Sequence, residues 1–191
     1  MFLTIDPGLG GTGLCVSGDA LFPVHTEVID SKSFGSSWTD RATEIADQLD
    51  SFADKWKLEE VYIELPAFFT SAKGASCAAG KNGGDSDLVK LSVLVGRFYE
   101  LFHRRGIPVE FIRINDWKGQ LPKRVVAQRV ANRLKCKPDA FPNHVMDAVG
   151  MSLHVKNCFS ANTGTNTAAL GVINENTKTG IVKIPNRYNQ K

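Results

Sequence analysis

The chain begins MFLTIDPGLGGTG (residues 1–13), where a short apolar run meets an aspartate, a proline and then a cluster of glycines. The apolar run predicts a buried strand over residues 2–5. Because carboxylates are rarely buried without a partner, an aspartate at the end of such a strand needs an explanation. Three interpretations of Asp6 are open: a turn residue in an Asp-Pro-Gly sequence, part of a glycine-rich phosphate-binding loop, or a metal ligand.

The composition indicates one soluble domain, or one domain with an appendage. The chain has 191 residues, of which 42% are hydrophobic and 23% charged, as is usual for globular proteins. The formal net charge of +3 permits a nucleic-acid partner without arguing for one. No apolar run reaches the length of a membrane span and no signal peptide is apparent, so we expect a cytoplasmic protein without a membrane partner. Four scattered cysteines predict free thiols and no zinc site: Cys15, Cys77, Cys136 and Cys158.

Hydrophobic periodicity predicts an α/β fold with a five-stranded mixed sheet flanked by helices. The first three strands form an antiparallel meander, and the fourth returns beside the first, parallel to it, through a right-handed crossover. The sheet and its helices occupy residues 1–157, and residues 158–191 form a polar C-terminal extension with a hairpin. After the first strand, we expect strands within residues 11–18, 20–29, 61–65 and 108–114, and helices over 38–56, 87–105, 122–135 and 143–156.

A second strand also ends in a carboxylate, because Glu64 closes the apolar run VYIEL (residues 61–65). If this strand is the parallel neighbour of the first, Glu64 and Asp6 lie at the same edge of the sheet. Two carboxylates this close repel each other unless one is protonated or a cation lies between them. A hard divalent cation with oxygen ligands, Mg²⁺ or Mn²⁺, resolves the repulsion.

The helix predicted last, NHVMDAVGMSLHV (residues 143–155), supplies further ligands. His144 and Asp147 are three residues apart and share one face near its start. Ala148 and Gly150 are small and allow this part of the helix to approach the sheet closely. These two side chains and the two strand-end carboxylates are predicted to converge on one or two metal ions. Two such ions can stabilise the attacking and leaving oxygens of a phosphodiester displacement.

Each of these residues also has an ordinary structural explanation. Asp6 alone is better explained as a turn residue, whereas for Glu64 alone an exposed strand end is an equally good explanation. Asp147 alone would be an acid that favours the helix dipole, and His144 a surface histidine. Only the set, with acids at two strand ends and an acid and a histidine on one helical turn, favours the metal site.

The same motifs together resemble the RuvC family of Holliday-junction resolvases, in the ribonuclease H-like superfamily. The similarity covers residues 1–157: IDPG in the first strand, IEL in the fourth, WK before the penultimate helix, and HxxDA followed by glycine in the last helix. It implies a Mg²⁺- or Mn²⁺-dependent endonuclease of DNA recombination and repair that nicks paired strands of branched DNA. It also implies a homodimer, joined through the helix over 87–105, and two ions per site bound by Asp6, Glu64, His144 and Asp147.

The sequence also departs from the family pattern. The segment after Glu64 is longer than in bacterial members, and the tail after residue 160 has no counterpart. Histidine at position 144 is not a departure, because family members carry either aspartate or histidine there. These departures suggest a phage or otherwise divergent member, which would act in the cytoplasm of an infected host cell and on a broader range of branched DNA.

A basic segment is the first candidate for binding DNA. Residues 118–137 contain seven basic residues and no acid, and basic side chains give affinity for phosphates irrespective of sequence. Lys118 and Lys123 flank a Gly-Gln-Leu-Pro turn at a predicted helix start, where an anion is favoured, and the family has a lysine pair there that contacts DNA. Arg124 follows directly. The alternative for the arginines further along is a solvated helix face.

The long glycine-bearing segment after Glu64 is the second candidate. It contains Phe68, Phe69, Lys73 and Lys81, and aromatic rings interleaved with lysines suit stacking on an opened base step together with backbone contacts. In the family an aromatic residue just after the catalytic glutamate wedges into the junction. The alternative is that the phenylalanines anchor the segment in the core.

Two other functions are compatible with parts of this pattern. A non-catalytic protein on the same fold would bind branched DNA without cleaving it, although such a protein has no physical reason to keep mutually repelling carboxylates together. An actin-like or sugar-kinase phosphate-binding domain also begins with a strand, an aspartate and glycines. It needs a second lobe with its own Asp-Gly turn, for which this chain is too short.

Overall fold

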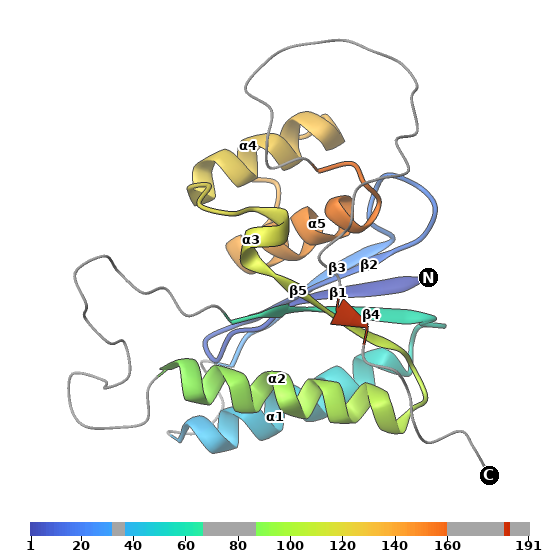
Figure 1. The fold of residues 1–191 in the computed structure, drawn as a ribbon, viewed down its shortest axis with the longest axis vertical. Coiled ribbons are helices and arrows are strands. Elements are labelled where there is room, and N and C mark those ends of the chain that lie inside the picture. Colours follow the sequence, from blue (N-terminus) through green and yellow to red (C-terminus); the bar gives the residue numbers. More distant parts are fainter. Residues whose placement is uncertain (32–36, 67–86, 160–181, 184–191) are drawn as a thin grey trace.

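The computed structural model describes residues 1–31, 37–66, 87–159 and 182–183. Figure 1 shows a mixed sheet between two helical layers, with α1 and α2 on one face and α3, α4 and α5 on the other. The strands are β1 (Phe2–Asp6), β2 (Thr12–Ser17), β3 (His25–Ile29), β4 (Glu60–Leu65), β5 (Val109–Arg113) and β6 (Val182–Lys183). The helices are α1 (Trp38–Ala53), α2 (Asp87–Arg104), α3 (Ile114–Trp117), α4 (Lys123–Leu134) and α5 (Asn143–Val155).

The order of the strands in the sheet is β3-β2-β1-β4-β5-β6. The first three form the predicted antiparallel meander, and β4 lies parallel to both β1 and β5. The five-stranded mixed sheet flanked by helices is therefore confirmed. The two-residue β6 adds to it, pairing antiparallel with β5 from within the predicted C-terminal extension. The other strand of the hairpin predicted in that extension lies outside the described residues.

Alternation along the strands divides the interior into two cores, one on each face of the sheet. On β1, Leu3 and Ile5 lie in the core under α1 and α2. Thr4, between them, faces α5 and donates a hydrogen bond from Oγ1 to the carbonyl of Ala148, at 2.7 Å. Because side chains on a strand alternate with a period of two residues, Asp6 lies on the same face as Thr4. The alternation of side chains along β1 therefore directs the Asp6 carboxylate toward α5.

Two glycines let α5 lie close against its neighbours. A Cβ atom on Gly13 of β2 would be 2.1 Å from the carbonyl oxygen of His144, so no larger residue is tolerated there without movement of the backbone. A Cβ atom on Gly150 would be 2.5 Å from the indole ring of Trp117. Gly150 thus makes room for the Trp117 side chain of α3. We expected Gly150 to let α5 approach the sheet closely, and in the structure that close approach depends on Gly13 instead.

Some element boundaries differ from the prediction. The third strand is shorter, because residues 18–24 connect β2 to β3. Helix α3 was not predicted, since four residues are too few to show helical periodicity. Helix α2 ends as expected before Gly106, which has a φ angle of +70°. Within the described part of the chain, no helix combines the length and the apolar character needed to cross a membrane.

Candidate active site

The strand ends bring two carboxylates together, at the edge of the sheet where β1 and β4 finish. Ile5 on β1 is in register with Ile63 on β4, so the next residues, Asp6 and Glu64, lie level on adjacent parallel strands. Each is only 7% exposed. Tyr62 packs in the core beneath α5, so Glu64, two residues further along β4, faces α5 as well.

Helix α5 adds the two other predicted residues, on its first turns. The Nδ1 atom of His144 lies 2.8 Å from Oδ2 of Asp6. Asp147 is 8% exposed, whereas the side chain of His144 remains 42% exposed. The structure therefore brings together all four residues that the sequence singled out, from three separate elements.

Helix α3 and its C-cap contribute two further residues, Trp117 and Lys118. The Nζ atom of Lys118 lies 2.8 Å from Oδ2 of Asp147 and 3.3 Å from Oε2 of Glu64. The indole Nε1 of Trp117 donates a hydrogen bond to the same Glu64 oxygen, at 2.9 Å. Lys118 was predicted to contact DNA, and here its ammonium group pairs with the carboxylates. Trp117 was not assigned a role, and its only signal was its position in the WK motif.

Burial and mutual repulsion change the ionisation of the carboxylates. Desolvation, followed by the negative charge of Asp6, raises the pKa of Glu64 to about 7. Desolvation likewise raises the pKa of Asp6. The hydrogen bond with Asp6 raises the pKa of His144. Burial opposes the charged form of Lys118, but the charge of Glu64 and the hydrogen bond with Asp147 outweigh burial and raise its pKa.

The side chains suit a hard divalent cation, although they are not yet arranged around one. Buried carboxylates whose negative charges repel one another supply the oxygen donors that Mg²⁺ and Mn²⁺ prefer. In the described part of the chain, no group of three or more His, Cys, Asp or Glu side chains is arranged to hold a metal ion as it stands. The Lys118 ammonium instead supplies the positive charge that Glu64 and Asp147 require.

The glycines after Asp6 pack around the imidazole of His144. A Cβ atom on Gly8 would lie 3.2 Å from Cε1 of His144, and one on Gly11 would lie 3.4 Å from Cδ2. Gly8 is held by Thr12, whose hydroxyl donates to its carbonyl at 3.1 Å. The small residues thus leave space for the histidine, which is a different role from cradling a phosphate.

The remaining residues predicted to bind DNA divide into two groups. Lys123 and Arg124 are exposed at the start of α4, and Lys123 lines a small pocket of about 30 Å³ together with Asp147. This position puts a basic side chain beside the acidic cluster. Phe68, Phe69, Lys73 and Lys81 lie outside the described residues, so their predicted contacts with DNA stay predictions.

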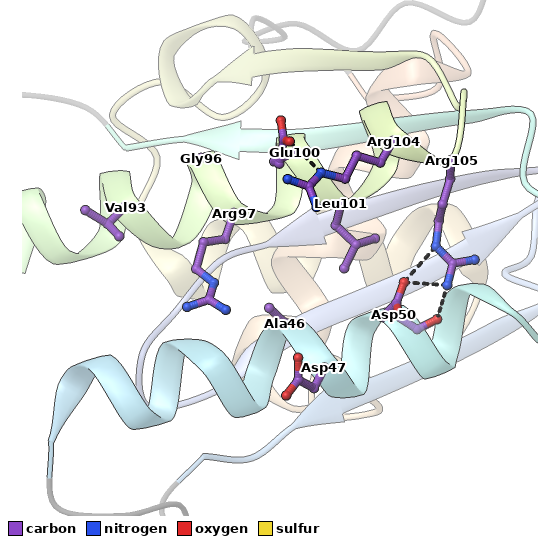
Figure 2. Close-up of a pocket in the computed structure, with 10 residues that line it drawn as sticks. All are labelled: Ala46, Asp47, Asp50, Val93, Gly96, Arg97, Glu100, Leu101, Arg104 and Arg105. Carbon is purple, nitrogen blue, oxygen red and sulfur yellow. Dashed lines mark hydrogen bonds and ion pairs between the residues drawn. The ribbon is translucent and has the colours of Figure 1, made fainter.

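A separate groove of about 600 Å³ lies between α1 and α2. Figure 2 shows it, with Arg105 bonded to Asp50 at one end and Arg97 above α1 at the other. Since α1 and α2 cover the opposite face of the sheet from α5 (Figure 1), this groove is remote from the acidic cluster.

The fold of this chain is similar to that of solved structures. The chain is similar to RuvC from Thermus thermophilus in complex with a Holliday junction substrate, with 23% identity and a TM-score of 0.58 over 80% of this chain and 91% of that chain. A second Thermus thermophilus RuvC structure matches with 22% identity and a TM-score of 0.57 over 79% and 91%. No protein-family model and no curated protein sequence matches. The fold is of the ribonuclease H-like class. Within that class it is RuvC-like, as the sequence motifs predicted.

Proposed function

We propose that the protein is a metal-dependent endodeoxyribonuclease that resolves Holliday junctions or other branched DNA by paired nicks. The observation that carries this proposal is the convergence of Asp6, Glu64 and Asp147, each less than 10% exposed, from three elements of a RuvC-like fold. Burying three carboxylates together destabilises a protein unless a cation offsets their charge. Such a cluster is therefore expected where the cation has a function.

Asp6, Glu64, His144 and Asp147 are the residues that would hold one or two Mg²⁺ or Mn²⁺ ions. When bound, such ions stabilise the charge that develops on a phosphodiester during its displacement and favour ionisation of the attacking water. Trp117 fixes one Glu64 oxygen through its indole N–H, at 2.9 Å. This hydrogen bond fixes the orientation of the carboxylate.

His144 has one ring nitrogen available for chemistry. Its Nδ1 atom is engaged by Asp6, which leaves Nε2 either to bind metal or to exchange a proton with the attacking or leaving oxygen. The hydrogen bond with Asp6 orients the ring for either role. Gly8 and Gly11 confine the ring on its other edges.

The DNA backbone is proposed to approach over the start of α4. Lys123 and Arg124 are exposed there, and Lys123 shares a pocket with Asp147. Basic side chains at this position would hold a phosphate next to the carboxylates without reading the base sequence. Phe68, Phe69, Lys73 and Lys81 are proposed to contact the opened branch point.

Paired nicks on two strands need two sites, so we propose a homodimer that forms through α2. On this helix Val93 is 44% exposed, and a Cβ atom on Gly96, one turn later, would meet nothing within 4 Å. Both line the groove between α1 and α2 (Figure 2). The charged residues beside them, Arg97 and Glu100, would pair across a two-fold axis.

A non-catalytic protein that binds branched DNA is the second candidate. The observation in its favour is that Lys118 already neutralises Glu64 and Asp147, so the cluster has a cation without any metal. The actin-like or sugar-kinase alternative loses its main support, because the glycines that would form its phosphate loop pack around His144.

The two remaining candidates are separated by a cleavage assay. A synthetic four-way junction, labelled on each strand in turn, is incubated with protein and Mg²⁺, beside a linear duplex and an EDTA control. We expect symmetric nicks in the junction only, and none with Asp6→Asn. Binding of the junction without nicks would establish the non-catalytic candidate. Equal cleavage by Asp6→Asn would refute the proposed metal site.

A further inference from the structure

The ammonium group of Lys118 lies where a metal ion would compete with it. Its Nζ atom contacts Oδ2 of Asp147 at 2.8 Å and Oε2 of Glu64 at 3.3 Å, and it lies 4.6 Å from the centroid of the Trp117 ring. The side chain of Lys118 is only 16% exposed. A lysine buried to this degree, with two carboxylate partners and an aromatic face beside it, is a specific counter-ion.

A divalent cation and this ammonium require the same carboxylates. Every oxygen that coordinates a metal ion loses capacity to bind the lysine, and two adjacent cations repel one another. Metal binding and the Lys118 ion pairs are therefore mutually unfavourable.

We propose that Lys118 is the resident counter-ion of the metal-free site, that metal binding displaces its ammonium group, and that the released group binds the phosphate of the DNA. This inference rests on the proposed metal site. Under this inference, metal binding and DNA binding strengthen one another. When a DNA phosphate pairs with the ammonium group of Lys118, Glu64 and Asp147 become free to bind the metal ion.

The local structure allows Lys118 to move while its neighbours stay in place. Lys118 is the residue that caps the four-residue α3, and Gly119 follows with a φ angle of +56°. Trp117, in contrast, is fully buried and packs against Gly150. A long side chain at the end of a short helix can change partners by rotating its own bonds, whereas the indole that holds Glu64 remains fixed.

The first test measures Mn²⁺ binding by titration calorimetry at pH 8, without DNA. The proteins are the wild type, Lys118→Met and the control Lys57→Met, which removes an equal charge from an exposed lysine between α1 and β4. We expect Lys118→Met to bind Mn²⁺ about 5- to 150-fold more tightly than the wild type, the usual range of coupling between sites. Lys57→Met should bind Mn²⁺ nearly as the wild type does.

The outcomes distinguish this inference from the proposed function. Mn²⁺ binding that is equal or weaker in Lys118→Met overturns the counter-ion role and leaves the metal site intact. An equal gain in Lys57→Met overturns it as well, since net charge would then explain the effect. If neither the wild type nor Lys118→Met binds Mn²⁺, the metal site itself is refuted, and both the inference and the proposed function fail.

A second test uses only the wild type, in case Lys118→Met does not fold. Amine acetylation is followed residue by residue by mass spectrometry during a Mn²⁺ titration. Displacement predicts that the reactivity of Lys118 rises along the same curve as metal binding, while that of the exposed Lys57 stays constant. Reactivity of Lys118 that does not change while Mn²⁺ binds would overturn the inference.

Discussion

The imidazole of His144 and the carboxylate of Asp6 form a hydrogen bond of 2.8 Å that joins the first turn of α5 to the end of β1. The two residues are 138 positions apart in the chain. This bond uses Nδ1 and leaves Nε2 as the nitrogen that can meet a metal ion or a phosphate oxygen. The orientation of the histidine is therefore a property of the assembled site.

Replacing His144 by glutamine is expected to slow nicking of a four-way junction by about 10²–10⁴-fold, because the amide cannot exchange a proton. Binding of the junction should change little, since His144 is not among the basic residues proposed to hold the backbone. Single-turnover cleavage and fluorescence anisotropy measure the two effects. His25→Gln, on β3, is the matched control. Nicking by His144→Gln at the wild-type rate would leave this histidine a purely structural role.

The buried Glu64 predicts that the metal-free protein loses stability as the pH rises from about 4.5 to about 7. Its pKa is raised from 4.5 to about 7 on folding, so within this window the folded state holds a proton that the unfolded state has released. The free energy of unfolding then decreases with pH, by a few kcal/mol at about 1.4 kcal/mol per pKa unit.

Denaturant unfolding in EDTA, followed from pH 4 to pH 8 in the wild type and in Glu64→Gln, measures this effect. Glutamine cannot ionise, so the decrease attributable to Glu64 should be absent from the variant. Added Mg²⁺ should restore stability to the wild type at pH 8 and have less effect on the variant. Parallel pH profiles of the two proteins would contradict the raised pKa.

Because α5 lies close against the sheet, we expect one added methyl group at Gly13 to reduce the stability of the protein strongly. In Gly13→Ala the new Cβ atom would be 2.1 Å from the carbonyl oxygen of His144, so α5 must shift, and we expect a loss of about 1–3 kcal/mol. Gly10→Ala is the control, because its Cβ atom would meet nothing within 4 Å. It should change stability by less than about 0.5 kcal/mol. Comparable losses in the two variants would refute the steric explanation.

We expect that replacing Lys123 will change the salt dependence of DNA binding. Removing one phosphate contact with Lys123→Met should reduce the slope of log K against log salt concentration by about 0.9. Affinity should fall to a similar extent for junctions of different sequence, because backbone contacts carry no base information. Junction binding measured between low and moderate salt gives the slope. An unchanged slope would exclude Lys123 from the DNA interface.

Most of the fold and the identity of the clustered residues followed from the sequence. Period-two and helical patterns located β1, β4, α2 and α5, because these patterns depend only on which residues face a core. Asp6 and Glu64 could be placed side by side, because parallel neighbours end at the same edge of a sheet. His144 and Asp147 followed from their spacing on one helical turn.

The tertiary structure decided the remaining contacts of the site. Trp117 had no assigned role, since nothing in a WK dipeptide shows that an indole will reach a carboxylate 53 residues away. Lys118 was assigned to DNA from its place in a basic segment, and its contact with Glu64 and Asp147 depends on where α3 packs. Gly8 and Gly11 suggested a phosphate loop, and the ring of His144 occupies the space beside them.

The sequence by itself thus determined which residues are buried, which strands and helices they form, and which acids share an edge of the sheet. Local periodicity and chain connectivity are sufficient for these properties. Only the tertiary structure decided which nitrogen of His144 has no bond to Asp6. It also decided that the Lys118 ammonium is the cation that pairs with the carboxylates. These depend on distances of about 3 Å between atoms of β1, β4, α3 and α5, and such distances follow from packing between elements that are remote in the chain.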